Sequence, residues 1–264
     1  MRDEFLTLKF SDHELAARRL LHGADVRQTG IVLFHSALAS MDTWRKFPYD
    51  LAVVLEQDVH MYDRRGHGHS SPLSAEVRRS DYLEHEARQV PRILDQLGLE
   101  TAIVIGHSDG GSIALLAAAM WPERVSSVVA IASHVYVEDI TLTGIRHVMA
   151  TATDTALLKR MRKYHGDKTE RLYQVWHETW LSPGHREWNL LGYLPKIQCP
   201  VLVMQGELDE YGTIEQVNAI VKGVGEKARA VMYPGVGHAV WRDREGDVVR
   251  EVAGFLSSCY LEKR

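Results

Sequence analysis

The chain has 264 residues, of which 45% are hydrophobic and 25% charged, and its formal net charge is −4. This composition is typical of one sizeable α/β domain with an insertion, and the small charge argues against nucleic-acid and anionic-membrane partners. The two cysteines, Cys199 and Cys259, are too few for a disulfide framework or a metal site and predict free thiols in a reducing compartment.

The N-terminal half alternates between short apolar runs and segments of helical spacing. Residues 4–22 alternate loosely between apolar and polar side chains, which predicts leading antiparallel strands. Neither a secretory signal nor an apolar stretch long enough to span a bilayer is present, so we expect a soluble, cytoplasmic protein. Further on, the predicted buried strands are 31–35, 59–62, 101–105 and 125–132, and the predicted helices are 44–57, 80–97 and 112–120.

The alternation breaks between residues 134 and 195. Four segments of helical spacing follow one another there with no strand between them, at 135–152, 155–165, 169–181 and 187–194. Aromatic and imidazole side chains concentrate in this region, and we expect about half of them to form its own small core. We therefore predict a helical cap at residues 134–195, inserted into a core made of residues 1–133 and 196–264.

After residue 195 the strands and helices alternate again. The predicted strands are 201–205 and 228–233, and the predicted helices are 214–222 and 245–258. This rhythm predicts an α/β fold with a mostly parallel central sheet and helices on both faces. Ligands of such a sheet bind outside the carboxyl ends of its strands.

One such strand end carries the sequence Gly106-His107-Ser108-Asp109-Gly110-Gly111. An apolar run that closes on a glycine-flanked serine and opens at once into a helix is the G-x-S-x-G nucleophile elbow. The turn exposes the serine hydroxyl, and the free N–H groups of the helix start are suited to a developing oxyanion. Because the motif is common by chance, its interpretation depends on the rest of the chain.

Two later strand ends supply the partners that a serine nucleophile requires. Asp209 follows the strand 201–205, and His238 lies in a glycine-rich loop after the strand 228–233. The order Ser108, acid, histidine is the order found with an elbow nucleophile, in which the histidine is the base and the acid orients it. Each residue also has a structural alternative: a turn serine, a helix-capping aspartate and a loop histidine. Glu138 and Asp139 are the alternative acids.

An acyl-transfer site also needs two donors for the carbonyl oxygen on which charge develops. We expect one to be the backbone N–H of Asp109 and the other to be the backbone N–H of Ala37, in the loop after the strand 31–35. The carboxylate of Asp109 would stabilise the first turn of its helix. Near an oxyanion it would be unfavourable, so we expect it to point away.

Taken together, Gly106–Gly111, Asp209 and His238 resemble the α/β-hydrolase family over essentially the whole chain. The segment 35–38 resembles the family's His-Gly-x-x oxyanion loop, with Ser36 where glycine is usual. The segment 63–70 resembles its Asp-x-x-Gly-x-Gly-x-Ser loop, which is structural in these enzymes. The resemblance implies an α/β-hydrolase fold with an inserted cap, and serine at the nucleophile position disfavours haloalkane dehalogenase and epoxide hydrolase chemistry.

The sequence therefore predicts a serine hydrolase that cleaves carboxylic esters of small or medium size through an acyl-enzyme, without metal or organic cofactor. A C–C bond hydrolase, thioesterase or lactonase of an aromatic-degradation pathway stays open, as does a non-catalytic small-molecule receptor on the same fold. The expected partner is a small-molecule ester. The candidate pocket residues are His134, Tyr136, Trp176, Trp180 and Trp188.

Overall fold

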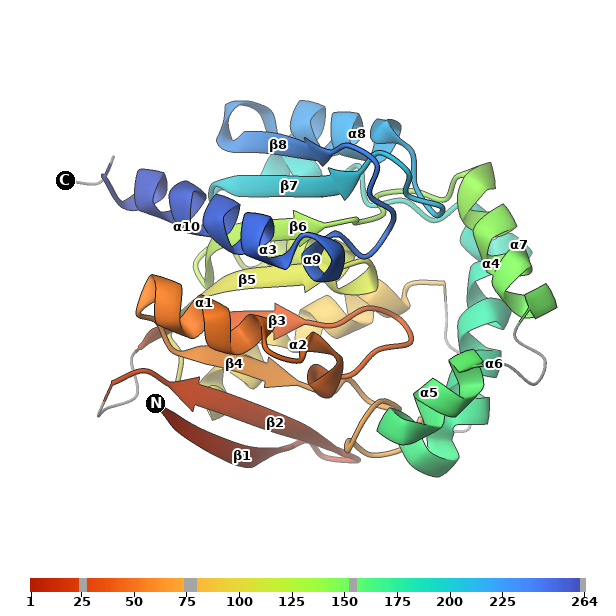
Figure 1. Ribbon diagram of the computed structural model, residues 1–264, viewed down its shortest axis with the longest axis horizontal. Helices are drawn as coiled ribbons and strands as arrows, with labels where there is room; N and C mark the ends of the chain where they lie inside the picture. Colours follow the sequence, from red (N-terminus) through yellow and green to blue (C-terminus); the bar gives the residue numbers. More distant parts are fainter. Residues whose placement is uncertain (24–27, 74–79, 152–155, 262–264) are drawn as a thin grey trace.

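The computed structural model describes residues 1–23, 28–73, 80–151 and 156–261. Its centre is an eight-stranded sheet in the order β1-β2-β4-β3-β5-β6-β7-β8 (Figure 1). The strand β2 pairs antiparallel with both β1 and β4, and the other neighbouring pairs are parallel, as predicted. The strands are β1 (Arg2–Lys9), β2 (Glu14–Leu21), β3 (Thr29–Phe34), β4 (Val59–Tyr62), β5 (Thr101–His107), β6 (Val125–Ile131), β7 (Val201–Gly206) and β8 (Ala228–Tyr233).

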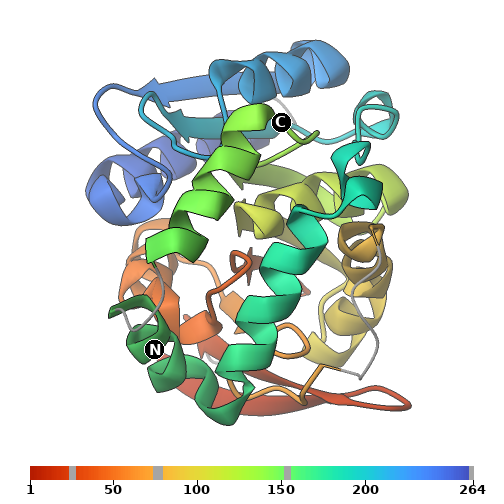
Figure 2. The same ribbon diagram turned by 90° about the vertical axis from the view of Figure 1, so that its right-hand side faces the viewer.

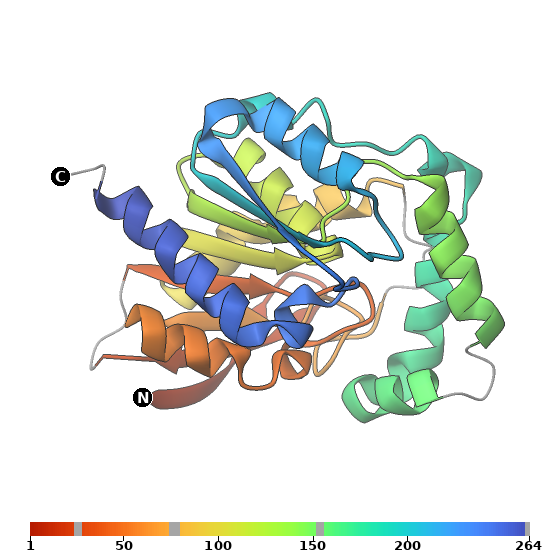
Figure 3. The ribbon, with the colours of Figure 1, turned by 45° about the horizontal axis from the view of Figure 1, so that its top comes forward.

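Helices cover both faces of the sheet. The helices α1 and α10 lie side by side on one face, and α2, α3 and α8 cover the other (Figure 3). The α-helices are α1 (Phe47–Leu55), α2 (Tyr82–Leu97), α3 (Asp109–Met120), α4 (Asp139–Thr151), α5 (Ala156–His165), α6 (Thr169–Trp180), α7 (Pro183–Arg186), α8 (Ile214–Val224), α9 (Val240–Asp243) and α10 (Glu245–Leu261). The 3-10 helices are η1 (Met41–Trp44), η2 (Gly166–Lys168), η3 (Leu194–Lys196) and η4 (Gly225–Lys227).

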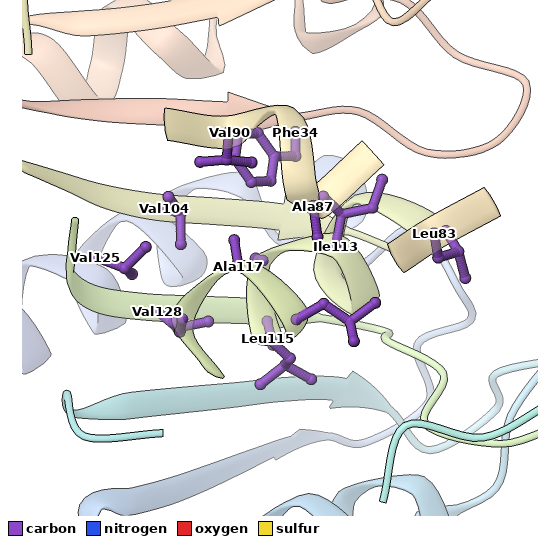
Figure 4. Close-up of a cluster of buried hydrophobic side chains, with 14 of the residues drawn as sticks. Phe34, Leu83, Ala87, Val90, Val104, Ile113, Leu115, Ala117, Val125 and Val128 are labelled. Atoms are coloured by element: carbon purple, nitrogen blue, oxygen red, sulfur yellow. The ribbon is translucent and has the colours of Figure 1, made fainter. Parts of the chain in front are cut away.

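Alternate side chains of the central strands enter opposite halves of the core. On β3, Ile31 and Leu33 pack in the cluster that contains α1 and α10, whereas Val32 and Phe34 pack in the cluster that contains α2 and α3. Figure 4 shows this second cluster, in which Ile113 and Ala117 of α3 lie against β5 and β6. A strand covered on both faces needs apolar residues at every position, which is why these strands are continuous apolar runs.

The strands β3 to β8 all end at one edge of the sheet, and the helices α4 to α7 lie beyond that edge (Figure 1). Figure 2 shows α4, α5 and α6 (green to teal) lying across the ends of the strands. We call residues 134–195 the inserted segment. Its role as a cap stays a prediction.

One helix of the inserted segment differs from expectation. The predicted helix 187–194 is wrong, because the α-helix here is the shorter α7, which starts three residues after Trp180. Ser182 caps its N-terminus and Pro183 occupies its first position, a combination that favours a helix start. Beyond the helix, Asn189 forms an isolated antiparallel bridge with Tyr136, so the backbone there pairs with another segment instead of continuing a helix.

The predicted helix 44–57 is also divided. Only its first residue, Trp44, belongs to η1, and α1 starts three residues later at Phe47 with Pro48 in its first turn. In the described part of the chain, no helix combines the length and the hydropathy needed to cross a membrane.

A buried histidine in β4 gives the fold a pH dependence. His60 has no exposed surface, and neither of its ring nitrogens has a hydrogen-bond partner among the described residues. Burial lowers its pKa from 6.5 to about 4, against a smaller opposing effect of the Asp58 charge. Between these two pH values the unfolded chain therefore binds more protons than the folded chain, and stability falls as the pH falls.

We expect a His60→Leu variant to lack the part of the pH dependence of stability that comes from His60. In the unmodified protein His60 should lower the free energy of unfolding by about 3 kcal/mol between pH 7 and pH 4. Urea unfolding at pH 7 and pH 4 measures the difference in the free energy of unfolding, which should be smaller in the variant. An equal pH dependence of the two proteins would contradict the prediction.

Candidate active site

Ser108 joins the end of β5 to the start of α3 in a strained turn. Its backbone angles are φ 56° and ψ −120°, a region that non-glycine residues rarely adopt. The turn is tight because a Cβ on Gly106 would lie 2.1 Å from the carbonyl oxygen of Gly110, and one on Gly110 would lie 2.0 Å from that of Phe34. Both glycines are therefore required by the close crossing of β3, β5 and α3.

His238 and Asp209 form a hydrogen-bonded pair at the ends of β8 and β7. The Nδ1 atom of His238 lies 2.9 Å from each carboxylate oxygen of Asp209. Burial alone would raise the pKa of Asp209, but the His238 charge and hydrogen bond, together with the N–H of Tyr211, hold that pKa below its ordinary value. The carboxylate is thus ionised at neutral pH and fixes the proton of the imidazole on Nδ1.

The loop that carries His238 is held by two further contacts. Its backbone N–H donates to the carboxylate of Glu210 at 3.1 Å, and its carbonyl oxygen lies 3.0 Å from Nε2 of His107. Burial is the main reason that the pKa of His107 falls to about 3, with the His238 charge next, so His107 is neutral and its Nε2–H donates. The residue before Ser108 therefore helps to position the imidazole of His238.

Ser108 and His238 line the same cavity, which has a volume of about 380 Å³. The cavity is also lined by Ala37 and Asp109. Neither of their backbone N–H groups donates a hydrogen bond within the part of the chain that the structure describes. The four residues expected at one site, together with the acid behind the histidine, are thus brought to one edge of the sheet.

A family model described as the α/β hydrolase fold matches residues 30–190. The chain belongs to the α/β hydrolase fold family. Among curated relatives, the serine hydrolase BPHL of Homo sapiens is 31% identical over 157 residues, which cover 57% of this chain and 53% of the relative. The chain therefore spans about half the length of that relative.

Two solved structures show how far the fold of this α/β hydrolase is shared. The enol-lactonase of Burkholderia xenovorans LB400 aligns with a TM-score of 0.74 at 21% identity, over 96% of this chain and 100% of the other. The proline iminopeptidase of Mycobacterium smegmatis aligns with a TM-score of 0.71 at 18% identity, over 99% and 100%. At these identities the likeness shows the fold alone.

The carboxylate of Asp109 in this α/β hydrolase has partners that the sequence did not reveal. It accepts a hydrogen bond from the hydroxyl of Tyr82 at 2.9 Å and pairs with the guanidinium of Arg64 at 3.4 Å. Arg64 is 0% exposed and Asp109 is 1% exposed, so this is a buried ion pair. Tyr82 in turn accepts a hydrogen bond from the indole of Trp180, which links the pair to the inserted segment.

Side chains also hold the carbonyl groups of the loop that contains Ala37. The guanidinium of Arg64 donates to the carbonyl oxygen of Ser36 at 3.0 Å, and Nε2 of His67 lies 2.7 Å from that of Ala37. With its carbonyl groups anchored, the loop keeps the N–H of Ala37 directed away from them. Such fixed donors need no reorganisation when charge develops nearby.

The inserted segment is fastened to the core beside this loop. His165 accepts a hydrogen bond from the N–H of Gly68 on Nδ1, so its Nε2–H donates to the carbonyl oxygen of Leu38 at 3.2 Å. Lys168 donates to the carbonyl oxygens of Gly68 and Ser70. The sequence did not point to these contacts, because a histidine and a lysine on a helix face are usually solvated.

Three of the five candidate pocket residues line the cavity with Ser108: His134, Trp176 and Trp180. The other two lie outside this lining. Trp188 is buried with its indole N–H bonded to the carboxylate of Glu84 at 3.1 Å, and Tyr136 belongs to the backbone bridge described above. In the described ranges, no group of three or more His, Cys, Asp or Glu side chains is arranged to hold a metal ion.

The two alternative acids have other partners. Asp139 pairs with Arg186 at 2.6 Å and its side chain is 91% exposed. Glu138 accepts hydrogen bonds from Thr213 and Gln216 at the start of α8. Both carboxylates are thus engaged away from the imidazole of His238.

Proposed function

We propose that this α/β hydrolase is a serine hydrolase that cleaves carboxylic esters of small or medium size through an acyl-enzyme. The observation that carries the proposal is the bond of Nδ1 of His238 to both oxygens of Asp209, at a cavity that also opens on Ser108. A base held in this tautomer presents Nε2 as a proton acceptor. The strained backbone of Ser108 supports its role as the nucleophile.

In the proposed reaction Ser108 attacks the ester carbonyl carbon while His238 takes the hydroxyl proton. The N–H groups of Ala37 and Asp109 stabilise the oxyanion. The C–O bond then breaks, and His238 gives its proton to the leaving alcohol oxygen. In the second half, His238 takes a proton from water, which attacks the acyl-enzyme and releases the acid and the Ser108 hydroxyl.

We further propose that residues 134–195 act as a cap over a hydrolase core of residues 1–133 and 196–264. Trp176 and Trp180 of α6 and His134 supply part of the cavity wall. Apolar aromatic walls bind acyl groups by burying their surface. A lactone is a cyclic ester, so lactonase activity would use the same machinery.

A fluorophosphonate probe tests the nucleophile and separates an enzyme from a receptor that only binds. We expect the native protein to be labelled and Ser108→Ala to be unlabelled, as read by mass spectrometry. Ser133→Ala is a matched control, since Ser133 is buried beside Gly111 and its hydroxyl has no hydrogen-bond partner among the described residues. Labelling that persists in Ser108→Ala, or none in the native protein, would overturn the assignment.

A further inference from the structure

A second cavity of about 380 Å³ adjoins the first. Its walls come from the loops that follow β3 and β8 and from α5 of the inserted segment. His238 and Arg160 line both cavities, whereas Ser108 lines only the first. Ser36, Leu38, Leu157 and Tyr211 also line both, so the two cavities adjoin along a boundary that includes His238, and a substrate held there could extend into both.

The chemistry assigns a different part of an ester to each cavity. The nucleophile bonds to the carbonyl carbon, so the acyl group stays in the cavity of Ser108. The histidine protonates the leaving oxygen, so that oxygen must lie at the imidazole when the C–O bond breaks. The second cavity is lined by His238 and not by Ser108, so it can receive the leaving alcohol while the acyl group stays in the first.

Charged side chains distinguish the second cavity from the first. Its lining includes three arginines, Arg45, Arg160 and Arg242, and two acids, Glu210 and Asp243. Arg242 is bonded to Asp243 at 2.8 Å, and Glu210 accepts the backbone N–H of the proposed base at 3.1 Å. Arg45 and Arg160 have no ion-pair partner within the described residues. With three arginines and two acids, the lining of the second cavity carries a net charge of +1 on a chain of net charge −4, and Arg45 and Arg160 are its two arginines outside an ion pair.

The backbone of Arg45 is a second, independent observation. Its angles are φ 54° and ψ −117°, nearly those of Ser108, and a long side chain is rarely found there. Arg45 is the C-cap that follows η1, and the neighbouring Trp44 is buried beside Trp241. Non-glycine residues in such strained conformations concentrate at functional sites and ligand clamps. A glycine would meet the needs of the turn, so the arginine side chain calls for another explanation.

We propose that the natural substrate is an ester whose leaving alcohol carries a negatively charged group, such as a carboxylate, and that Arg45 and Arg160 bind this group in the second cavity. This inference rests on the proposed esterase function. Guanidinium groups match carboxylates in geometry and keep their charge throughout the physiological pH range. The anion would bind before the chemical step and leave with the alcohol.

Two nearly isosteric esters test the inference: 4-carboxyphenyl acetate and its neutral amide, 4-carbamoylphenyl acetate. We expect the kcat/KM of the unmodified protein to be roughly tenfold higher for the carboxylate. Arg160→Gln and Arg45→Gln should each lower this carboxylate-to-amide ratio several-fold, and the ratio should also fall as NaCl is raised to 1 M. Arg146→Gln on α4 is the matched control, an exposed arginine outside both cavity linings, and should keep the ratio.

The outcomes separate this inference from the proposed function. A ratio near one in the unmodified protein, or a ratio that neither variant changes, would overturn the inference while leaving the esterase intact. If neither ester is hydrolysed and the phosphonate probe does not react, the proposed function fails instead. Calorimetry with 4-hydroxybenzoate and 4-hydroxybenzamide then decides the anion site: the carboxylate should bind more tightly and Arg160→Gln should weaken it, and equal binding of the two would refute the site.

Discussion

An Asp209→Asn variant is expected to hydrolyse p-nitrophenyl acetate with a kcat about four orders of magnitude lower than the unmodified protein. The carboxylate accepts the Nδ1–H of His238 at both oxygens, which leaves Nε2 unprotonated for its proposed role as the base. An asparagine amide presents a donor at one of these positions and favours the opposite tautomer. Steady-state kinetics at pH 7.5 measure the loss, because the lowered pKa of Asp209 keeps its carboxylate ionised there.

Asp139→Asn is the control for this variant. Asp139 also follows a strand end, but its side chain is almost fully exposed and pairs with Arg186. Its replacement should leave kcat unchanged within about twofold, because its carboxylate is bonded to Arg186 and not to His238. Full activity in Asp209→Asn together with loss of activity in Asp139→Asn would transfer the acid role to Asp139. Urea unfolding of both variants shows whether any loss reflects the chemistry or the fold.

Most of the sheet could be predicted because its signals are local. The strands β4 and β8 have the bounds that their apolar runs indicate, and β3, β5, β6 and β7 differ by one or two residues at their ends. The prediction of a helix at 187–194 is wrong because a turn whose apolar side chains face the core can show the same spacing as a helix. Backbone contacts with a segment remote in sequence decide between the two: the bridge between Tyr136 and Asn189 and the bond from the N–H of Leu190 to the carbonyl oxygen of Val135.

The positions of the main residues of the candidate site could be predicted for the same reason. Ser108, Asp209 and His238 each follow an apolar strand, and parallel strands carry their ends to one edge. The partners of Asp109 were not predictable, because Arg64 and Tyr82 reach it from a loop and a helix that no sequence spacing connects. A charged residue in the first turn of a helix whose other residues are all small or apolar was the available signal. Burial of that turn implies a partner for the charge.

Breaking the buried ion pair between Arg64 and Asp109 should have a large effect on the free energy of unfolding. We expect Asp109→Asn to lower the free energy of unfolding by about 3 kcal/mol, because it leaves the fully buried guanidinium without its counter-charge. Arg64→Met should cost a similar amount by stranding the carboxylate. Tyr82→Phe, which removes one hydrogen bond to the same carboxylate and keeps the ring, should cost only about 1 kcal/mol.

The double variant Arg64→Met/Asp109→Asn distinguishes a stranded charge from a general packing defect. With both charges removed, no buried group lacks a counter-charge, and the double variant should be more stable than either single variant. Urea unfolding of the four proteins gives the coupling free energy, and strictly additive losses would contradict the interpretation. Arg64 also binds the carbonyl oxygen of Ser36, next to Ala37. The double variant should therefore regain stability but not the proposed esterase activity, because the loop that carries the proposed oxyanion donor Ala37 has lost an anchor that no gain in stability replaces.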